Sequence, residues 1–447
     1  MESKIPESPG STVQQPKRSG SGSDWVISIK GTIHKACQGE LEYSPDNCIY
    51  RVSESVRKVA PEAYAPQLLS MGPYHKLSGM NQRKWRAVDH MLTRTNHDIN
   101  VYLEAVMEGV EDAKRCYDEK ITNDEDFVEI LVRDGVFLLE MMRAWNKGLE
   151  DTIFNVAQSD YTVLMDVIKL ENQIPLTVLE TILRTQLSEE YAPGLVAAMA
   201  TTFLGRLTPS MSKRRRGSIQ FDSKAVDNEL HMLDILRDCL LYSSADPIEN
   251  YFKKTDKNDE YDCSVIGCVT ELVNVGVRFQ KSDSDDFWRI EFVDGVLKIP
   301  VLHLDGYSFP MFLNLVAYEQ TYNFINNNIT SYVRFMSDLI KSSKDVAHLR
   351  DEEIIFNFIG SDAHVAEQFQ KLTDEVFDDV YDDYLKVVRK NLSIQKNRRS
   401  NKWFASLMLE YFKNPWTIIS VIAATVLLIL TLLQTLYSMI GYHHPKK

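Results

Sequence analysis

The sequence predicts a mainly α (α+β) protein: a multi-helix globular domain with a small antiparallel β-meander, followed by one C-terminal transmembrane helix. Three observations predict this class. Apolar residues recur every three or four positions through most of the chain, and three short β-prone runs lie together between residues 277 and 304. Residues 416–440 carry no charge at all. A chain of 447 residues with 44% hydrophobic content is also long enough to bury a large core.

Residues 1–45 differ from the rest of the chain, because they are rich in Ser, Gly, Pro and Lys. Such a segment buries too little apolar surface to offset the entropy lost on ordering, so we expect a disordered tail. Residues 46–413 then form one mainly helical domain. A break in the helical pattern at 205–228 suggests a boundary between two lobes.

Helices are predicted in order along this domain. An extended, turning segment at 63–75 contains two prolines and a Gly-Pro step. Apolar spacing predicts helices over 124–145 and 161–170, and over 176–187 with Pro175 suited to its first turn. A helix over 265–275 closes at Gly276, and helices resume from 309 to 384 and again over 403–412.

The β-meander rests on three short runs, 277–279, 287–293 and 296–304, which are rich in β-branched and aromatic residues. Turn-forming residues at 283–286 and at Asp294-Gly295 separate them. We therefore expect consecutive strands to pair antiparallel.

The uncharged run at 416–440 predicts a membrane span. A helix rises ~1.5 Å per residue, so about 20 residues cross a hydrocarbon core of ~30 Å. Trp416 lies at one border of the run and Tyr437 near the other, as aromatic residues do at membrane interfaces. A short polar tail, 441–447, follows. Membrane lipid is thus the first predicted partner.

Charges beside the span predict a cytosolic domain. The first apolar stretch, 25–29, is too short for the hydrophobic region of a signal peptide. Four cations on the N-terminal side of the span, against two lysines beyond it, favour a cytosolic N-terminal side and contact with anionic headgroups: Arg398, Arg399, Lys402 and Lys413. Plasma membrane and endomembrane both remain open.

Overall charge and cysteine spacing exclude other classes. The formal net charge of −13 argues against a nucleic-acid partner, which would favour a basic surface. Six cysteines are scattered without a C-x-x-C pair, so neither a disulfide framework nor a zinc site is indicated. We favour reduced thiols.

No catalytic or cofactor motif is present: the chain lacks a P-loop, G-x-S-x-G, a strand-linked G-x-G-x-x-G and H-E-x-x-H. No cofactor or metal is therefore expected. An acid–base site could still arise if the polar residues that border apolar runs converged: His75, Asp134, Glu140, Glu171, Gln173 and Glu319. The alternative, which we favour, is that these side chains cap helices or pair with arginines.

A basic loop offers one modification site. Arg215 and Arg216 precede Ser218 by three and two residues, a spacing typical of basophilic kinase substrates. The alternative is an unmodified, solvated loop, and this is the simpler expectation.

Several segments, taken in order, resemble the plant domain of unknown function 247 family. They include Ile49-Tyr50-Arg51-Val52, Ser70-Met71-Gly72-Pro73-Tyr74-His75, Asp134-Gly135-Val136-Phe137-Leu138-Leu139-Glu140, Leu170-Glu171-Asn172-Gln173-Ile174-Pro175, Ala317-Tyr318-Glu319-Gln320 and Tyr411-Phe412-Lys413-Asn414-Pro415-Trp416. The resemblance extends from about residue 46 to 440, with departures at Ser53 and Lys76. It implies a plant, mostly helical protein with one C-terminal membrane helix and no agreed activity. The association of grass members with pollen self-incompatibility points towards recognition, by analogy only.

These observations favour a tail-anchored, non-enzymatic module that recognises another, unidentified protein at a membrane, as in signalling. The alternative is a membrane-tethered enzyme that uses the histidine and carboxylate cluster around His75, Asp134 and Glu171.

Overall fold

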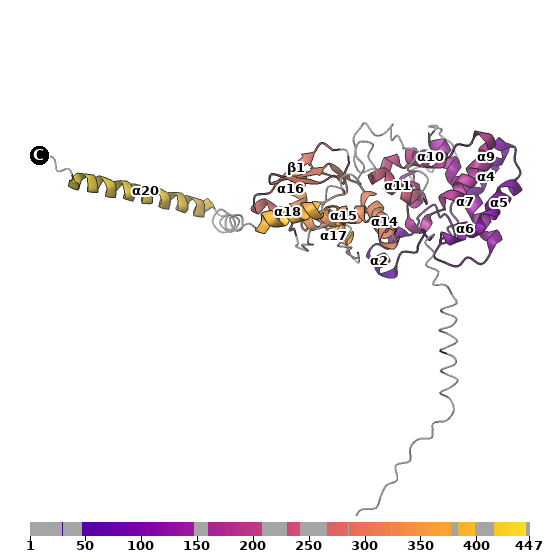
Figure 1. Cartoon of the computed structure of the whole chain (residues 1–447), viewed down its shortest axis with the longest axis horizontal. Helices are drawn as coiled ribbons and strands as arrows, with labels where there is room; N and C mark the ends of the chain where they lie inside the picture. The colour runs from indigo at the N-terminus through magenta and orange to yellow at the C-terminus, as the bar shows by residue number, and fades with distance from the viewer. Residues whose placement is uncertain are drawn as a thin grey trace, which may run out of the picture. The chain divides into compact units, whose positions relative to one another are not determined.

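The computed structural model describes Ile29 and residues 47–146, 160–207, 230–241, 266–284, 286–322, 324–374, 376, 383–397 and 415–443. Figure 1 shows the described elements in colour. Four predicted segments lie outside these residues: the disordered tail apart from Ile29, most of the lobe boundary, the helix expected at 403–412 and the polar tail beyond 443.

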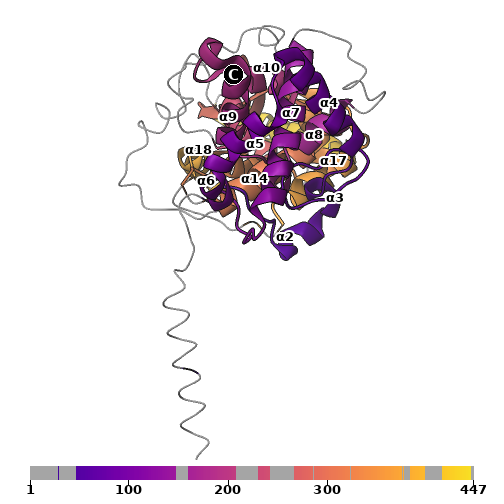
Figure 2. The same cartoon turned by 90° about the vertical axis from the view of Figure 1, so that its right-hand side faces the viewer.

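The first half of the domain is helical and is organised around one long helix, α7. Asp124, Glu125 and Asp126 occupy its first turn, where carboxylates complement the helix dipole, and more than half of its residues are buried. Helices α4, α5, α9 and α10 all pack against it, as Figures 1 and 2 show. The bounds are α2 Glu54–Val59, α3 Pro61–Tyr64, α4 Asn81–Thr95, α5 Ile99–Glu108, α6 Val110–Arg115, α7 Asp124–Asn146, α8 Asp160–Val167, η1 Leu170–Asn172, α9 Leu176–Leu187, η2 Ser188–Glu190, α10 Leu195–Leu204 and η3 Gly205–Leu207.

Two helix predictions for this half are confirmed: the helix expected at 124–145 is α7, and the one expected at 176–187 is α9. Pro175, expected in the first turn of α9, is instead its N-cap. The helix expected at 161–170 ends earlier, because α8 stops at Val167 and Leu170 already lies in η1. Gly135 allows α9 to approach α7, because an added Cβ there would lie 2.7 Å from Ile182 Cδ1.

The second half combines helices with two small sheets. Its bounds are α11 Met232–Leu241, α13 Val269–Asn274, β1 Arg278–Ser282, β2 Glu291–Val293, β3 Val296–Pro300, β4 Leu302–Leu304, α14 Ser308–Thr321, α15 Asn328–Leu339, α16 Ser343–Asp351, β5 Ile355–Asn357, α17 Asp362–Lys371 and α18 Lys386–Asn397. Helix α14 joins the two halves, since Asn314 donates to the Ala63 carbonyl at 2.9 Å and accepts from the Leu170 N–H at 3.0 Å.

The three-stranded sheet of β1, β2 and β3 does not have the strand order of a meander. Strands β2 and β3 form an antiparallel hairpin around Asp294-Gly295, both with positive φ, as the turn residues predict. Strand β1 instead pairs parallel with the far edge of β3, giving the order β1-β3-β2. The predicted all-antiparallel meander is therefore wrong.

Burial explains the difference. Phe287 and Trp288, expected in a strand, are 2% and 1% exposed and lie in a turn within the core. The chain between β1 and β2 therefore passes through the core, and the returning strand β3 inserts between them. A second sheet pairs β4 with β5 in parallel. Strand β5 lies within 309–384, where only helices were expected, so that prediction is wrong at this point.

The C-terminal helix α20 spans Pro415–His443. Its segment Ile419–Met439 is 21 residues long, apolar, and exposed in the structure. At ~1.5 Å per residue this segment extends about 30 Å, the thickness of a bilayer core. The predicted class, a mainly helical domain with a small sheet and one apolar C-terminal helix able to cross a membrane, is confirmed.

Candidate functional site

Glu171 is the centre of a polar cluster beneath α2. It lies in η1, and its side chain is 1% exposed. One carboxylate oxygen accepts the Val52 N–H at 2.8 Å and pairs with the Arg57 guanidinium; the other lies 2.9 Å from His75 Nε2. Arg51 adds a positive charge at 3.9 Å. The structure thus brings together two of the predicted site residues, His75 and Glu171.

These partners decide the ionisation of Glu171. Burial by itself raises the pKa of the carboxyl, but the hydrogen bonds from His75 and the Val52 N–H, together with the charge of Arg57, outweigh it and leave the pKa lowered. A carboxylate held ionised in this way is a weak base near neutral pH. Its evident effect is mechanical, because it ties α2 and the preceding strand-like segment to η1.

Asp134 and Glu140 both lie on α7 but have separate partners. Asp134 is buried with Lys84, whose Nζ lies 2.8 Å from its carboxylate, and accepts from Arg133 Nε at 2.9 Å. Burial lowers the pKa of Lys84 despite the neighbouring carboxylate. Glu140 pairs with Arg94 at 2.6 Å. Asp134 and Glu140 are therefore each neutralised by a neighbouring cation, and they do not form a shared site.

Both carboxylate oxygens of Glu319, on α14, accept hydrogen bonds. One oxygen accepts Arg237 Nε at 2.9 Å and the Ile329 N–H at 3.0 Å; the other accepts the Thr330 N–H at 2.7 Å and the Thr330 hydroxyl at 2.8 Å. The Glu319 side chain therefore caps the start of α15 and holds Arg237 in the core.

The Gln173 side chain forms hydrogen bonds with main-chain groups. Its amide donates to the carbonyls of Val167 and Lys169 at 2.8 and 2.6 Å, and its side-chain oxygen accepts the Leu233 N–H at 3.1 Å. All six predicted residues thus lie in the described structure: His75 is paired with Glu171, and the other five are paired with arginine, lysine or main-chain groups.

Sequence reasoning missed one equally important carboxylate, Asp166. It is fully buried and accepts three consecutive N–H groups, from Gln67, Leu68 and Leu69, at 2.7 to 2.9 Å. A single Asp inside the apolar stretch 161–170 was the available signal. Its anchoring of the 63–75 segment explains why that segment can remain irregular.

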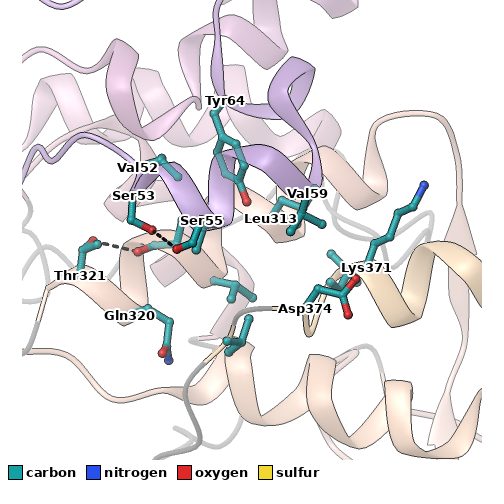
Figure 3. Close-up of a pocket in the computed structure, with 15 residues that line it drawn as sticks. Val52, Ser53, Ser55, Val59, Tyr64, Leu313, Gln320, Thr321, Lys371 and Asp374 are labelled. Atoms are coloured by element: carbon teal, nitrogen blue, oxygen red, sulfur yellow. Dashed lines mark hydrogen bonds between the residues drawn. The ribbon is translucent and has the colours of Figure 1, made fainter.

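Next to the Glu171 cluster lies a cavity of ≈ 210 Å³. One wall is α2 with Val52, Val56 and Val59; the opposite wall is α14 with Leu313 and Val316. Figure 3 shows the Tyr64 ring pointing from α3 into the space between these walls. The last residues of α17 and the chain beyond it close the third side, with Lys371, Leu372 and Asp374.

The interior of the cavity is apolar and its mouth is polar. Ser53 and Ser55 hydrogen-bond to each other at 3.2 Å at the mouth, and Gln320 lies opposite them. The Arg57–Glu171 pair and the Glu171–Val52 hydrogen bond fix α2 above the cavity. The geometry therefore suits binding of a small molecule more than proton-transfer chemistry.

Other predicted sites give no further chemistry. Within the described ranges, no group of three His, Cys, Asp or Glu side chains is placed to hold a metal ion. Ser218 and the cations Arg398, Arg399, Lys402 and Lys413 lie outside the described residues. Tyr437 is 81% exposed on α20, and Trp416 lies in the first turn of the same helix.

Fold and site together define a class: a mainly helical domain with structural polar clusters, a small-molecule-sized cavity and an apolar C-terminal helix. Comparison with known proteins places the chain further. The DUF247 family, described as plant proteins of unknown function, matches residues 49–430. The chain belongs to this family.

Two curated relatives agree with that placement. The chain is 26% identical over 437 residues to UPF0481 protein At3g47200 of Arabidopsis thaliana, covering 90% of this chain and 88% of the relative. It is 23% identical over 518 residues to putative UPF0481 protein At3g02645 of the same plant, covering 93% and 94%. No solved structure matches.

Proposed function

We propose that this protein is a membrane-anchored recognition module, whose helical domain is displayed in the cytosol on α20 and binds another protein in a signalling role. The observation that carries the proposal is the exposed apolar surface of Ile419–Met439. An apolar surface of this length is stable in lipid and unfavourable in water. The helix therefore supports a function performed at a membrane surface.

The polar clusters support a binding role more than a catalytic one. Glu319 makes four hydrogen bonds to Arg237, Ile329 and Thr330, so its oxygens have no capacity left for a substrate. The carboxylates of Glu171 and Asp134 are likewise occupied by hydrogen bonds and ion pairs within the protein.

A membrane-tethered enzyme is the second candidate, and one observation favours it. His75 is 18% exposed, and its Nε2 lies 2.9 Å from Glu171, an arrangement in which a carboxylate orients an imidazole that reaches solvent. The lowered pKa of Glu171 and its pairing with Arg57 support a structural role instead.

The first test separates anchoring from recognition. The full chain, tagged at its N-terminus, should stay with membranes through alkaline carbonate extraction, whereas a chain lacking 415–443 should be released. Protease added to intact vesicles should digest the tagged domain if it faces the cytosol.

Recognition is then tested by proximity labelling from the N-terminus of the full chain. The control joins residues 415–447 to an unrelated soluble domain, which reproduces the anchor alone. A neighbour labelled only by the full chain, and crosslinked directly to the purified protein, supports the proposal. Identical labelling by both chains contradicts it.

A further inference from the structure

We propose that the cavity between α2, α14 and the end of α17 binds a compact, neutral, mostly apolar molecule that carries one hydrogen-bond acceptor, such as a ring bearing a carbonyl group. This inference goes beyond the proposed recognition role and does not depend on it.

The size and lining of the cavity set the body of the ligand. An apolar cavity of about 150 Å³ accommodates benzene, so a volume of ≈ 210 Å³ accommodates a ring with a short substituent. Val52, Val59, Leu313, Val316 and Leu372 surround it with apolar atoms. A ligand inside gains by removing apolar area from water on both sides of the contact.

Tyr64 sets the polar requirement. Its side chain lines the cavity and is 1% exposed, and Figure 3 shows no hydrogen bond from its hydroxyl to the other lining residues. The hydroxyl therefore faces the space in which a ligand would lie. Burial also raises the pKa of Tyr64, so the hydroxyl keeps its proton and is available as a donor. A hydrogen-bond acceptor on the ligand would pair with this hydroxyl.

The charges at the mouth favour a neutral ligand. Lys371 is paired with Glu367 at 2.9 Å, and Asp374 lies beside it. An anionic ligand would be repelled by the Asp374 carboxylate, and the charge of Lys371 is already neutralised by Glu367. A cation would have to enter apolar walls beneath the mouth, at a large desolvation cost.

Helix α2 gives the ligand a route in. It has only six residues, none of them buried, and its N-cap Ser53 makes no capping hydrogen bond from its side chain. It is held mainly through Arg57 and the neighbouring Val52, both bonded to Glu171. Since no residue of α2 is buried, this wall can move once its bonds to Glu171 break, and a bound ligand should hold it closed.

The test uses two probes of nearly the same shape, acetophenone and α-methylstyrene, in which a carbonyl oxygen is replaced by CH₂. Full-length protein in lipid nanodiscs, with labelled Val and Leu methyl groups, is titrated with each probe by NMR. The methyl signals of Val52, Val56 and Val316 report the site directly. Partition of a probe into lipid is equal for all variants, so it cancels when ratios of affinities are compared.

Tyr64→Phe is the informative variant, because it removes only the hydroxyl. We expect saturable shifts at these methyls, and an acetophenone-to-α-methylstyrene affinity ratio about 3- to 10-fold lower in Tyr64→Phe than in the wild type, the effect of one buried hydrogen bond. Ala317→Leu, which fills the cavity from α14, should weaken both probes at least about five-fold.

Hydrogen exchange of the α2 amides provides an independent readout and should slow on addition of acetophenone to the wild type. The proposal is overturned if the wild type shows no saturable shift with either probe, or if Tyr64→Phe leaves the ratio unchanged. Neither outcome would affect the labelling test of protein recognition.

Discussion

Gly72→Ala tests how closely the 70–75 segment must approach the core. Gly72 has a φ of +67°, and a Cβ added there would lie 2.8 Å from the backbone oxygen of Gln173 and 3.2 Å from the Tyr117 hydroxyl. These two atoms are themselves joined by a hydrogen bond of 3.0 Å. The new methyl group would therefore push directly against a buried hydrogen bond.

Three contributions set the magnitude. A left-handed backbone costs an L-residue roughly 1–2 kcal/mol. Stretching or breaking the Tyr117–Gln173 bond costs about 1–3 kcal/mol more, since both groups are buried. Alanine restricts the unfolded chain, which returns about 0.4–1 kcal/mol. We expect a net loss of roughly 2–4 kcal/mol in the free energy of unfolding.

The chain supplies matched controls. Gly295 has a φ of +75° but no atom within 4 Å of an added Cβ, so Gly295→Ala isolates the backbone contribution and should cost about 1 kcal/mol. Gly79 has neither constraint, and Gly79→Ala should be neutral or slightly stabilising. Urea unfolding of the full chain in nanodiscs, followed by tryptophan fluorescence, measures all three. Equal losses in Gly72→Ala and Gly295→Ala would refute the close approach.

Two further predictions concern the carboxylates. The pKa of Glu171 is lowered in the folded state, so its contribution to stability is full above its ordinary pKa and is lost as the pH falls through the lower folded value. Urea midpoints of the wild type should therefore fall as the pH drops below the ordinary glutamate pKa of about 4.5, and those of Glu171→Gln should fall less; parallel curves would contradict this assignment. Glu319→Gln should cost about 3–5 kcal/mol at neutral pH, because an amide cannot accept from Arg237 and Thr330 together. The same change at Glu291, whose pair with Arg289 is partly exposed, should cost at most about 1 kcal/mol, and equal costs at the two positions would be inconsistent with a buried network.

Local residue pattern was sufficient to predict the helical class, the position of the apolar C-terminal helix and the bounds of α7 and α9. These features depend on local periodicity: the spacing of Phe127, Leu131 and Leu138 is enough to predict α7, and the absence of charge over 416–440 is enough to predict α20. The Asp294-Gly295 turn was equally local, because positive φ angles favour these residue types.

Contacts between distant parts of the chain depended on tertiary packing. In the sequence, His75 and Glu171 are two polar residues among several, and chain packing brings them within 2.9 Å of each other. The same packing pairs Asp134 with Lys84 and Glu319 with Arg237. The insertion of β3 between β1 and β2 was likewise set by the burial of Phe287 and Trp288. The cavity lined by Tyr64 has no sequence signal at all, because its walls come from positions 52–64, 313–321 and 371–376. Contacts at such separations depend on the packing of the whole chain, and local residue pattern does not encode them.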